Sequence, residues 1–266
     1  MAPKNTRSFR DILVYLSAGD NARARLKAAI ALAKEHGARL TGLDVNHPAV
    51  YDTDRAPEAA SLEETFMQEV ALAGVAHAFH AARDVEHEGW RALYAHYADI
   101  VVSPSASEAD ARFVLRAVPE AVLLHGGVPV LVIPDLWQSQ PVGKRIVVSW
   151  NASPQATHAV HDTLPLLTRA DSVTIFAFDA NQRVLREESK QMIDHLAAHG
   201  VDAHAFTWPD TGELDPVDAL FSCLSEEDAD LVVAGGYGHP RLMERLLGGV
   251  SRTLMRTLTV PVVMSH

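Results

Sequence analysis

Short apolar runs alternate with longer segments of helical periodicity along this chain. The run at residues 11–16 is followed by residues 21–34, where apolar positions recur every three or four residues, as is typical of an amphipathic helix. Gly37 is a natural helix end, and residues 39–45 predict a second strand. A strand, a helix and a strand in this order predict parallel pairing, because a crossover helix returns the chain to the same end of the sheet.

The rest of the first half continues the alternation. We expect a loop at residues 51–60, and Ser61-x-x-Glu64 matches a capping box that would start a long helix reaching about Arg83. Further elements are expected at residues 92–97 (helix), 99–103 (strand), 113–125 (helix) and 128–133 (strand). Residues 134–143 contain proline and polar residues and indicate a linker.

The pattern restarts after this linker. Residues 145–149 predict a strand, Ser153-Pro154 predicts a helix N-terminus, and residues 173–178 predict another strand. The two halves also match directly: residues 98–102 resemble residues 229–233, at an offset of 131 from Asp99 to Asp230. An offset near half the chain length indicates a duplicated domain and not a solenoid of short repeats.

The fold class that follows is α/β. We expect two tandem Rossmann-like domains, each with a mostly parallel sheet flanked by helices. The domains are predicted at residues 8–136 and 143–266.

Glycines gather near the end of the second half. The apolar run at residues 231–234 leads into Gly235-Gly236-Tyr237-Gly238, and a helix-like segment at residues 241–247 leads into Gly248-Gly249-Val250-Ser251. A strand, a glycine loop and a helix start point backbone N–H groups at an anion, and Ser251 adds a hydroxyl donor. This pattern predicts a phosphate cradle, although the glycines could instead form the tight turn that lets a helix pack on the sheet.

The matching positions of the first half carry other residues. Pro104, Ser105, Ser107, Ala117, Val118 and Glu120 stand opposite Gly235, Gly236, Gly238, Gly248, Gly249 and Ser251. The first half has therefore lost the glycines of the cradle and gained a carboxylate where a phosphate would lie. We predict one competent site, in the second half.

Composition narrows the class of protein. With 266 residues, of which 48% are hydrophobic and 21% charged, the sequence is typical of a globular protein. A net charge of −11 argues against nucleic acid as a partner, and no apolar stretch has the length of a signal peptide or a membrane span. We expect a cytoplasmic protein with no membrane partner. The single cysteine, Cys223, lies in an apolar pattern and is expected to be buried.

The glycine spacing resembles the signature of the universal stress protein family. It consists of Gly235-x-x-Gly238, then Gly248 and Val250-Ser251, and a closing strand at residues 260–263. The duplication makes the chain similar to a tandem form of that family. The resemblance implies a five-stranded parallel sheet in each domain and ATP or another adenine nucleotide, with Mg²⁺, at the carboxyl ends of the strands.

The resemblance also implies roles for individual residues. Gly235, Gly238, Gly248 and Ser251 would lie around the phosphates and ribose, with Gly249 and Val250 in the same loop. Asn151 would lie near the base or ribose, and the backbone of Phe178 or Asp179 near the adenine. His239 could donate to a phosphate or be a turn residue facing water. Two positions depart from the pattern of ATP-binding members: Gly249 replaces a Ser or Thr, and Asn151 replaces an acid, as Ser17 does in the first half.

Three functions stay open at this point. The leading one is an adenine-nucleotide-responsive sensor or regulator in the stress response, because no Walker-type lysine, metal-holding carboxylate or catalytic base can be named. The alternatives are an interaction protein of the same fold that binds no nucleotide, and a slow ATPase that would need Asp179 or Asp210 near the phosphates.

Histidines and edge strands suggest two further features. His195/His199, His158/His161 and His77/His80 each lie three or four residues apart, but no cysteine or acid completes an evident zinc set, so no metal is predicted.

The final strands of the two halves would be sheet edges. The resemblance suggests that they pair with each other, so that one chain mimics a dimer. A homodimer of whole chains is a further expectation.

Overall fold

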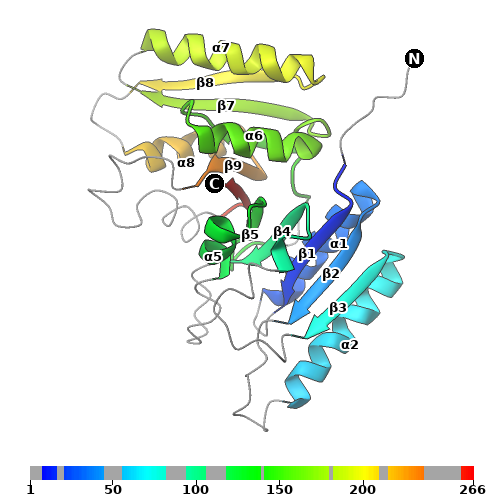
Figure 1. Cartoon of the computed structure of the whole chain (residues 1–266). Helices are drawn as coiled ribbons and strands as arrows, with labels where there is room; N and C mark the ends of the chain where they lie inside the picture. The colour runs from blue at the N-terminus through cyan, green and yellow to red at the C-terminus, as the bar shows by residue number, and fades with distance from the viewer. Residues whose placement is uncertain are drawn as a thin grey trace. The chain divides into compact units, whose positions relative to one another are not determined.

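A computed structural model describes residues 8–16, 21–44, 56–81, 94–105, 118–138, 141–179, 182–209, 215–236 and 259–266. These residues fall into two compact units, a first unit within Ser8–Gln140 and a second unit within Pro141–His266. Each unit is an α/β layer structure (Figure 1).

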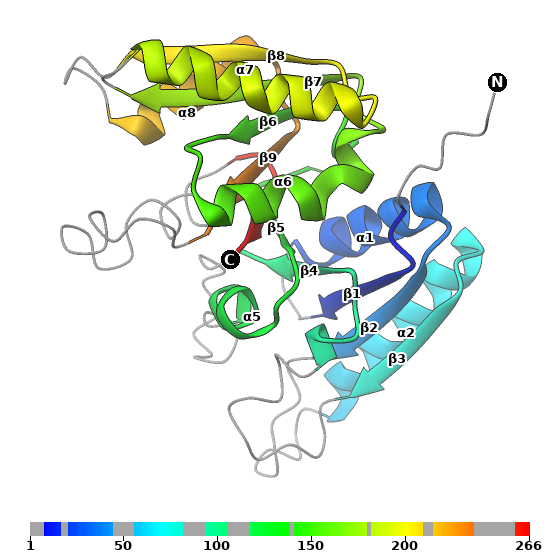
Figure 2. The ribbon, with the colours of Figure 1, turned by 45° about the horizontal axis from the view of Figure 1, so that its top comes forward.

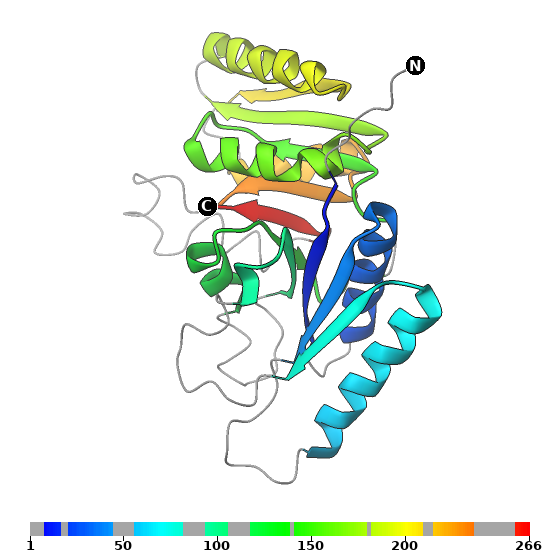
Figure 3. The ribbon, with the colours of Figure 1, turned by 45° about the vertical axis from the view of Figure 1, so that its right-hand side comes forward.

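The first unit contains a parallel sheet in the order β3-β2-β1-β4-β5. Helices α1 and α2 lie side by side on one face of this sheet (Figure 3), and α5 packs against β4 and β5. The strands are β1 (Asp11–Leu16), β2 (Arg39–Asp44), β3 (His77–Ala81), β4 (Ile100–Pro104) and β5 (Val130–Ile133). The helices with described bounds are α1 (Ala22–His36), α2 (Ala56–Ala73) and α5 (Val118–His125).

The second unit repeats this arrangement, in the order β10-β9-β6-β7-β8, again with parallel pairing. Helix α6 packs against β9 and β10, and α7 packs against β7 and β8 on the same side, while α8 covers the other side (Figure 2). The strands are β6 (Arg145–Ser149), β7 (Ser172–Asp179), β8 (Ala203–Pro209), β9 (Leu231–Gly235) and β10 (Val262–Ser265). The helices are α6 (Pro154–Leu167), α7 (Gln182–Ala198) and α8 (Pro216–Glu226). The predicted fold class is confirmed.

Several predicted boundaries are confirmed by local chemistry. Strands β1 and β6 begin and end where the apolar runs do. Gly37 ends α1 in the left-handed conformation, with φ 63°, which costs glycine nothing. Ser153 caps α6, since its side chain accepts a hydrogen bond of 3.2 Å from the N–H of Ala156, and Pro154 follows at the first helical position.

The long helix predicted from Ser61 to about Arg83 is wrong at both ends. Helix α2 begins at Ala56, inside the predicted loop, so Ser61 lies within the helix and does not cap it. The helix ends at Gly74, whose φ of 68° directs the chain away, and the N–H of Val75 then donates to the carbonyl of Val70. Residues His77–Ala81 form the edge strand β3 and not a continuation of the helix.

Other predictions lie partly or wholly outside the described residues. Of the helix predicted at residues 92–97, Tyr94 and Ala95 are helical, but His96 and Tyr97 form a turn, so its predicted end is wrong. Of the helix predicted at residues 113–125 the structure describes α5. The helix-like segment at residues 241–247 is not among the described residues. Pairing between the final strands of the two halves stays a prediction. No described helix has the length and apolar character to cross a bilayer.

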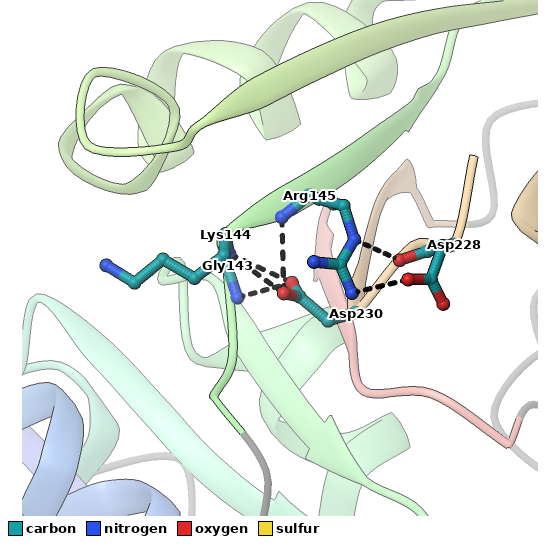
Figure 4. Close-up of polar contacts among 5 residues, drawn as sticks. All are labelled: Gly143, Lys144, Arg145, Asp228 and Asp230. Carbon is teal, nitrogen blue, oxygen red and sulfur yellow. Dashed lines mark hydrogen bonds and ion pairs between the residues drawn. The ribbon is translucent and has the colours of Figure 1, made fainter.

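A carboxylate joins the amino ends of two strands in the second unit. Asp230, just before β9, accepts hydrogen bonds from the backbone N–H groups of Gly143 (2.8 Å), Lys144 (2.9 and 3.1 Å) and Arg145 (3.2 Å) (Figure 4). Its own N–H donates to the carbonyl of Arg145 at 2.9 Å. These bonds fasten β9 to β6, although the two strands are far apart in the sequence.

The first unit has the same carboxylate bridge. Asp99, at the position that matches Asp230, accepts hydrogen bonds from the N–H groups of Arg10 (2.6 Å) and Asp11 (3.0 Å). The N–H of Asp99 donates to the carbonyl of Asp11 at 2.8 Å. The duplicated Ala-Asp-apolar sequence therefore has a duplicated structural role.

Replacing Asp230 by alanine should lower the free energy of unfolding by about 1–3 kcal/mol, because three backbone N–H groups lose their acceptor. Urea unfolding followed by circular dichroism measures the change. Asp228→Asn is the matched control: it removes the charge from the ion pair with Arg145 (3.0 Å) at a side chain that is 89% exposed, and asparagine tolerates the positive φ at this position. This variant should lose less than about 1 kcal/mol. Equal losses in both variants would contradict the structural role of Asp230.

The contribution of Asp230 to the free energy of unfolding should change with pH in a definite direction. Burial raises the pKa of Asp230 above its ordinary value of 3.8, against the opposing pull of the backbone N–H groups and of Arg145. The folded state therefore favours the protonated form, and this contribution to stability is lost as the pH rises through the folded pKa. Asp230→Asn does not titrate, so the stability of the wild type relative to this variant should fall as the pH rises from 3.8 through the folded pKa of Asp230. A rise over that interval would show that the hydrogen bonds outweigh burial.

The buried thiol of Cys223 should be inert. Its side chain is fully buried in α8, and burial, reinforced by Glu227 and Glu226, raises its pKa to about 12. Because the thiolate is the reactive form, a thiol reagent such as DTNB should label the native protein only as fast as it unfolds. Labelling in urea is the positive control, and rapid stoichiometric labelling in native buffer would contradict this expectation.

Candidate functional site

The candidate site lies where β6 and β9 end. In the order β10-β9-β6-β7-β8, the chain leaves β6 through α6 toward β7 on one side, and β9 is added later on the other side. The connections therefore diverge between β6 and β9. In parallel α/β sheets, ligands bind outside the carboxyl ends of the strands at this kind of switch point. Two predicted site residues lie at these strand ends: Asn151 follows β6, and Gly235 is the last residue of β9.

Gly235 is the last residue of β9, and the first turn of α6 lies directly against it. A Cβ atom placed on Gly235 would lie 2.5 Å from the backbone nitrogen of Ala156 and 2.7 Å from the carbonyl carbon of Gln155. Such distances are too short for any side chain, so glycine is required here for packing. The structure thus gives Gly235 a role in seating α6 on the sheet, whether or not a phosphate also approaches it.

Asn151 helps to build the turn that leads from β6 into α6. Its side-chain oxygen accepts a hydrogen bond of 3.2 Å from the N–H of Ser153, and Ala152 between them has φ 54°. The side chain of Asn151 is exposed. Its oxygen is therefore engaged in the turn, while its amide nitrogen can donate to a ligand.

Phe178 lies near the end of β7. The last bond between β7 and the β6 segment runs from the N–H of Trp150 to the carbonyl of Phe176, at 2.8 Å, so Phe178 lies two residues beyond it. On its other side Phe178 is in register with Trp208 of β8. The structure thus brings Asn151, Phe178 and Gly235 to the carboxyl ends of three neighbouring strands.

Three buried polar atoms near this edge were not predicted from the sequence. Trp150 Nε1, Gln155 Oε1 and Ser265 Oγ are buried and have no hydrogen-bond partner in the part of the chain that the structure describes. Trp150 follows β6, Gln155 belongs to the α6 turn that touches Gly235, and Ser265 is in register with Gly235. A buried polar atom without a partner costs about 1–3 kcal/mol, so their concentration here indicates groups that an additional molecule could satisfy.

The start of the glycine loop is held by the C-terminal residues. The N–H of Gly236 donates to the carbonyl of Ser265 at 2.7 Å, and the Nδ1 atom of His266 lies 3.1 Å from the carbonyl oxygen of Gly236. The Nδ1 atom of His158, on α6, lies 3.4 Å from the carbonyl oxygen of His266. Gly235 and Gly236 are therefore fixed by the neighbouring strand and by α6.

The same end of the first unit contains a buried charge. Arg25 of α1 is only 1% exposed, and its Nε–H donates to the carbonyl of Tyr15 in β1 at 3.1 Å. Asp44, the last residue of β2, is also 1% exposed. The helix begins after Asn21, whose amide donates to the carbonyl of Pro134. Among its described residues, the first unit thus places a buried guanidinium and a buried carboxylate at this edge.

The remaining predicted site residues lie outside the described residues. They are Gly238, His239, Gly248, Gly249, Val250 and Ser251. Asp210 also lies outside them, and of Asp179 only the backbone is described. The phosphate half of the predicted site and the carboxylates of the ATPase alternative therefore stay predictions.

Comparison with known proteins identifies one family. Residues 210–266 match the model of the universal stress protein family. This segment is therefore similar to that family. The matched segment contains every predicted glycine of the loop, from Gly235 to Gly249. No curated protein matches the chain.

Solved structures extend the similarity of fold over both units. A universal stress protein from Archaeoglobus fulgidus DSM 4304 is similar with a TM-score of 0.73 and 18% identity, over 96% of this chain and 95% of that one. A functionally unknown protein from Pseudomonas aeruginosa PAO1 is similar with a TM-score of 0.63 and 16% identity, over 97% of this chain and 92% of that one. The fold of this chain is thus found in proteins of similar length, including a universal stress protein.

The packing role of Gly235 can be tested by stability alone. Gly235→Ala should lower the free energy of unfolding by about 1–3 kcal/mol, because the new methyl group would overlap the backbone of the α6 turn. Thermal and urea unfolding of the full chain without ligand measure the loss. An unchanged stability would mean that α6 is not seated on Gly235.

Proposed function

We propose that the second unit binds an adenine nucleotide at the carboxyl ends of β6 and β9, and that the bound nucleotide makes the chain a sensor or regulator in the stress response. The observation that carries this proposal is the coincidence of the family match over residues 210–266 with the switch point of the sheet, where Gly235 ends β9. The glycine spacing of the family therefore begins at the place where parallel α/β sheets hold ligands.

The base and ribose would lie at the carboxyl ends of β6 and β7. Asn151 supplies an amide donor in a turn that is already formed, and the backbone of Phe178 extends beyond the ladder with β6. The unpartnered atoms of Trp150 and Gln155 offer one donor and one acceptor for the polar edges of a nucleoside. The site would then be formed before the nucleotide arrives, which lowers the entropic cost of binding.

The phosphates would lie on the glycine loop. The residues proposed to contact them are Gly235, Gly238, His239, Gly248, Gly249, Val250 and Ser251. Backbone N–H groups of glycines, together with the Ser251 hydroxyl, suit phosphoryl oxygens, and Mg²⁺ would accompany the phosphates. A hydroxyl is missing at Gly249, where the ATP-binding pattern has Ser or Thr, so we expect weaker binding than a complete loop would give.

A second candidate function is an interaction protein of this fold that binds no nucleotide. The packing of Gly235 against α6 favours it, because the first glycine of the pattern is explained without any ligand. The two candidates differ in one measurable property, which is saturable binding of a nucleotide to the full chain.

Titration of the full chain with ATP, ADP and AMP in the presence of Mg²⁺ tests the proposal. Thermal unfolding should show stabilisation by at least one of them, amounting to about 2.7 kcal/mol at a hundred times the dissociation constant. Asn151→Ala and Ser251→Ala should each weaken binding by about tenfold or more, because each removes a polar contact to the ligand. Ser17→Ala, at the matching position of the first half, is the control and should leave binding unchanged.

Adding the missing hydroxyl to the glycine loop should strengthen ATP binding and so tests the proposal in the opposite direction. Gly249→Ser should tighten the binding of ATP by about ten- to a hundredfold, because a hydrogen bond to a charged group contributes about 1.5–3 kcal/mol. Calorimetry measures the affinity, and release of phosphate from ATP distinguishes a binder from a slow ATPase. Absence of saturable binding for all three nucleotides would favour the interaction protein.

A further inference from the structure

Three histidine side chains meet on the outer side of the second unit. His161 belongs to α6, His195 to the last turn of α7, and His199 to the turn that follows α7. The two helices run along the same side of the sheet (Figure 2). The ring centroids of His161 and His195 are 5.3 Å apart, and those of His195 and His199 are 4.9 Å apart. Part of this cluster is exposed, so solutes can reach it.

The distance between two of the ring nitrogens fits a shared ion. The Nε2 atoms of His161 and His195 are 3.3 Å apart. Two nitrogens bound to one tetrahedral zinc at about 2.0–2.1 Å would lie about 3.3–3.4 Å from each other. His199 lies in the turn that follows α7, and its ring lies beside that of His195 at a centroid distance of 4.9 Å.

We propose that His161, His195 and His199 form a surface site for a divalent transition-metal ion of the class that prefers imidazole ligands, such as Zn²⁺. His161 and His195 are already at ligand spacing, and His199 supplies the third nitrogen by rotation of its side chain, with water completing the coordination. No set of three or more His, Cys, Asp or Glu side chains within the described ranges is already arranged around one ion, so this last rotation is an essential part of the proposal. The ion would join α6 to α7.

This site could not be read from the sequence. The spacing of histidines within each helix suggests pairs, and no acid or cysteine completes them, so the sequence predicts no metal. The pairing that matters is between helices, from His161 to His195, and depends on how α6 and α7 pack. The rival explanation is a direct hydrogen bond between the two imidazoles, in which one ring donates and the other accepts.

Calorimetric titration of the untagged full chain with ZnCl₂, after removal of metals with EDTA, tests the proposal. The wild type should show one site that binds more tightly than the background of the other surface histidines. His195→Gln and His161→Gln should each weaken this site by at least about tenfold, because each removes one of the two pre-placed ligands. His125→Gln, which removes an exposed histidine of α5, is the matched control and should leave the site unchanged.

A spectroscopic measurement separates a metal site from a hydrogen-bonded pair. With Cu²⁺ as the probe, the electron paramagnetic resonance spectrum should show coupling to two or more imidazole nitrogens, and His199→Gln should reduce that number by one. Circular dichroism confirms that each variant is folded. If the variants of the cluster bind Zn²⁺ as the wild type does, or if no site stands above the background, the proposal is overturned and the cluster is only a hydrogen-bonded pair.

Discussion

The carboxylate of Asp230, with the backbone N–H groups of Gly143, Lys144 and Arg145, determines how the second sheet is put together. Strands β6 and β9 are parallel neighbours, yet no turn joins them, so their register needs a fixed contact. The bonds to Asp230 supply that contact at the amino ends. With the register fixed there, Ser149 lies opposite Ala234, and the residues that follow both strands come to the same edge. The candidate site at this edge depends on that alignment.

The two units share this framework and differ at the opposite edge. Asp99 makes the same bridge in the first unit, while Pro104 stands where the second unit has Gly235. The first unit places the buried Arg25 near the carboxyl end of β1, where it donates to Tyr15. A buried guanidinium is costly to desolvate and needs acceptors around it, so Arg25 constrains the side chains at this edge of the first unit. The two units thus share the carboxylate bridge at the amino ends and carry different residues at the carboxyl ends.

Much of the fold could be predicted because the spacing of apolar residues and the residue types that end helices depend only on the local sequence. The apolar runs of β1 and β6 and the left-handed Gly37 needed no tertiary information. Strand β3 was missed because His77–Ala81 is short and only partly buried, and Gly74 was the overlooked helix stop. The site was less predictable. Packing requires a glycine at position 235, and phosphate binding would favour one too, so the residue type alone does not distinguish the two roles. The unpartnered atoms of Trp150 and Ser265 depend on burial that only the folded chain provides.

Helix α6 connects the separate parts of the second unit. Its first turn rests on Gly235, its side chain His158 reaches the C-terminal residue, and its His161 contacts α7. A ligand shifts a conformational equilibrium only by binding one state better than another. The nucleotide site proposed beside the first turn of α6 and the metal site proposed between α6 and α7 share this helix. Coupling between the two sites would require a second state of α6 that each ligand binds less well.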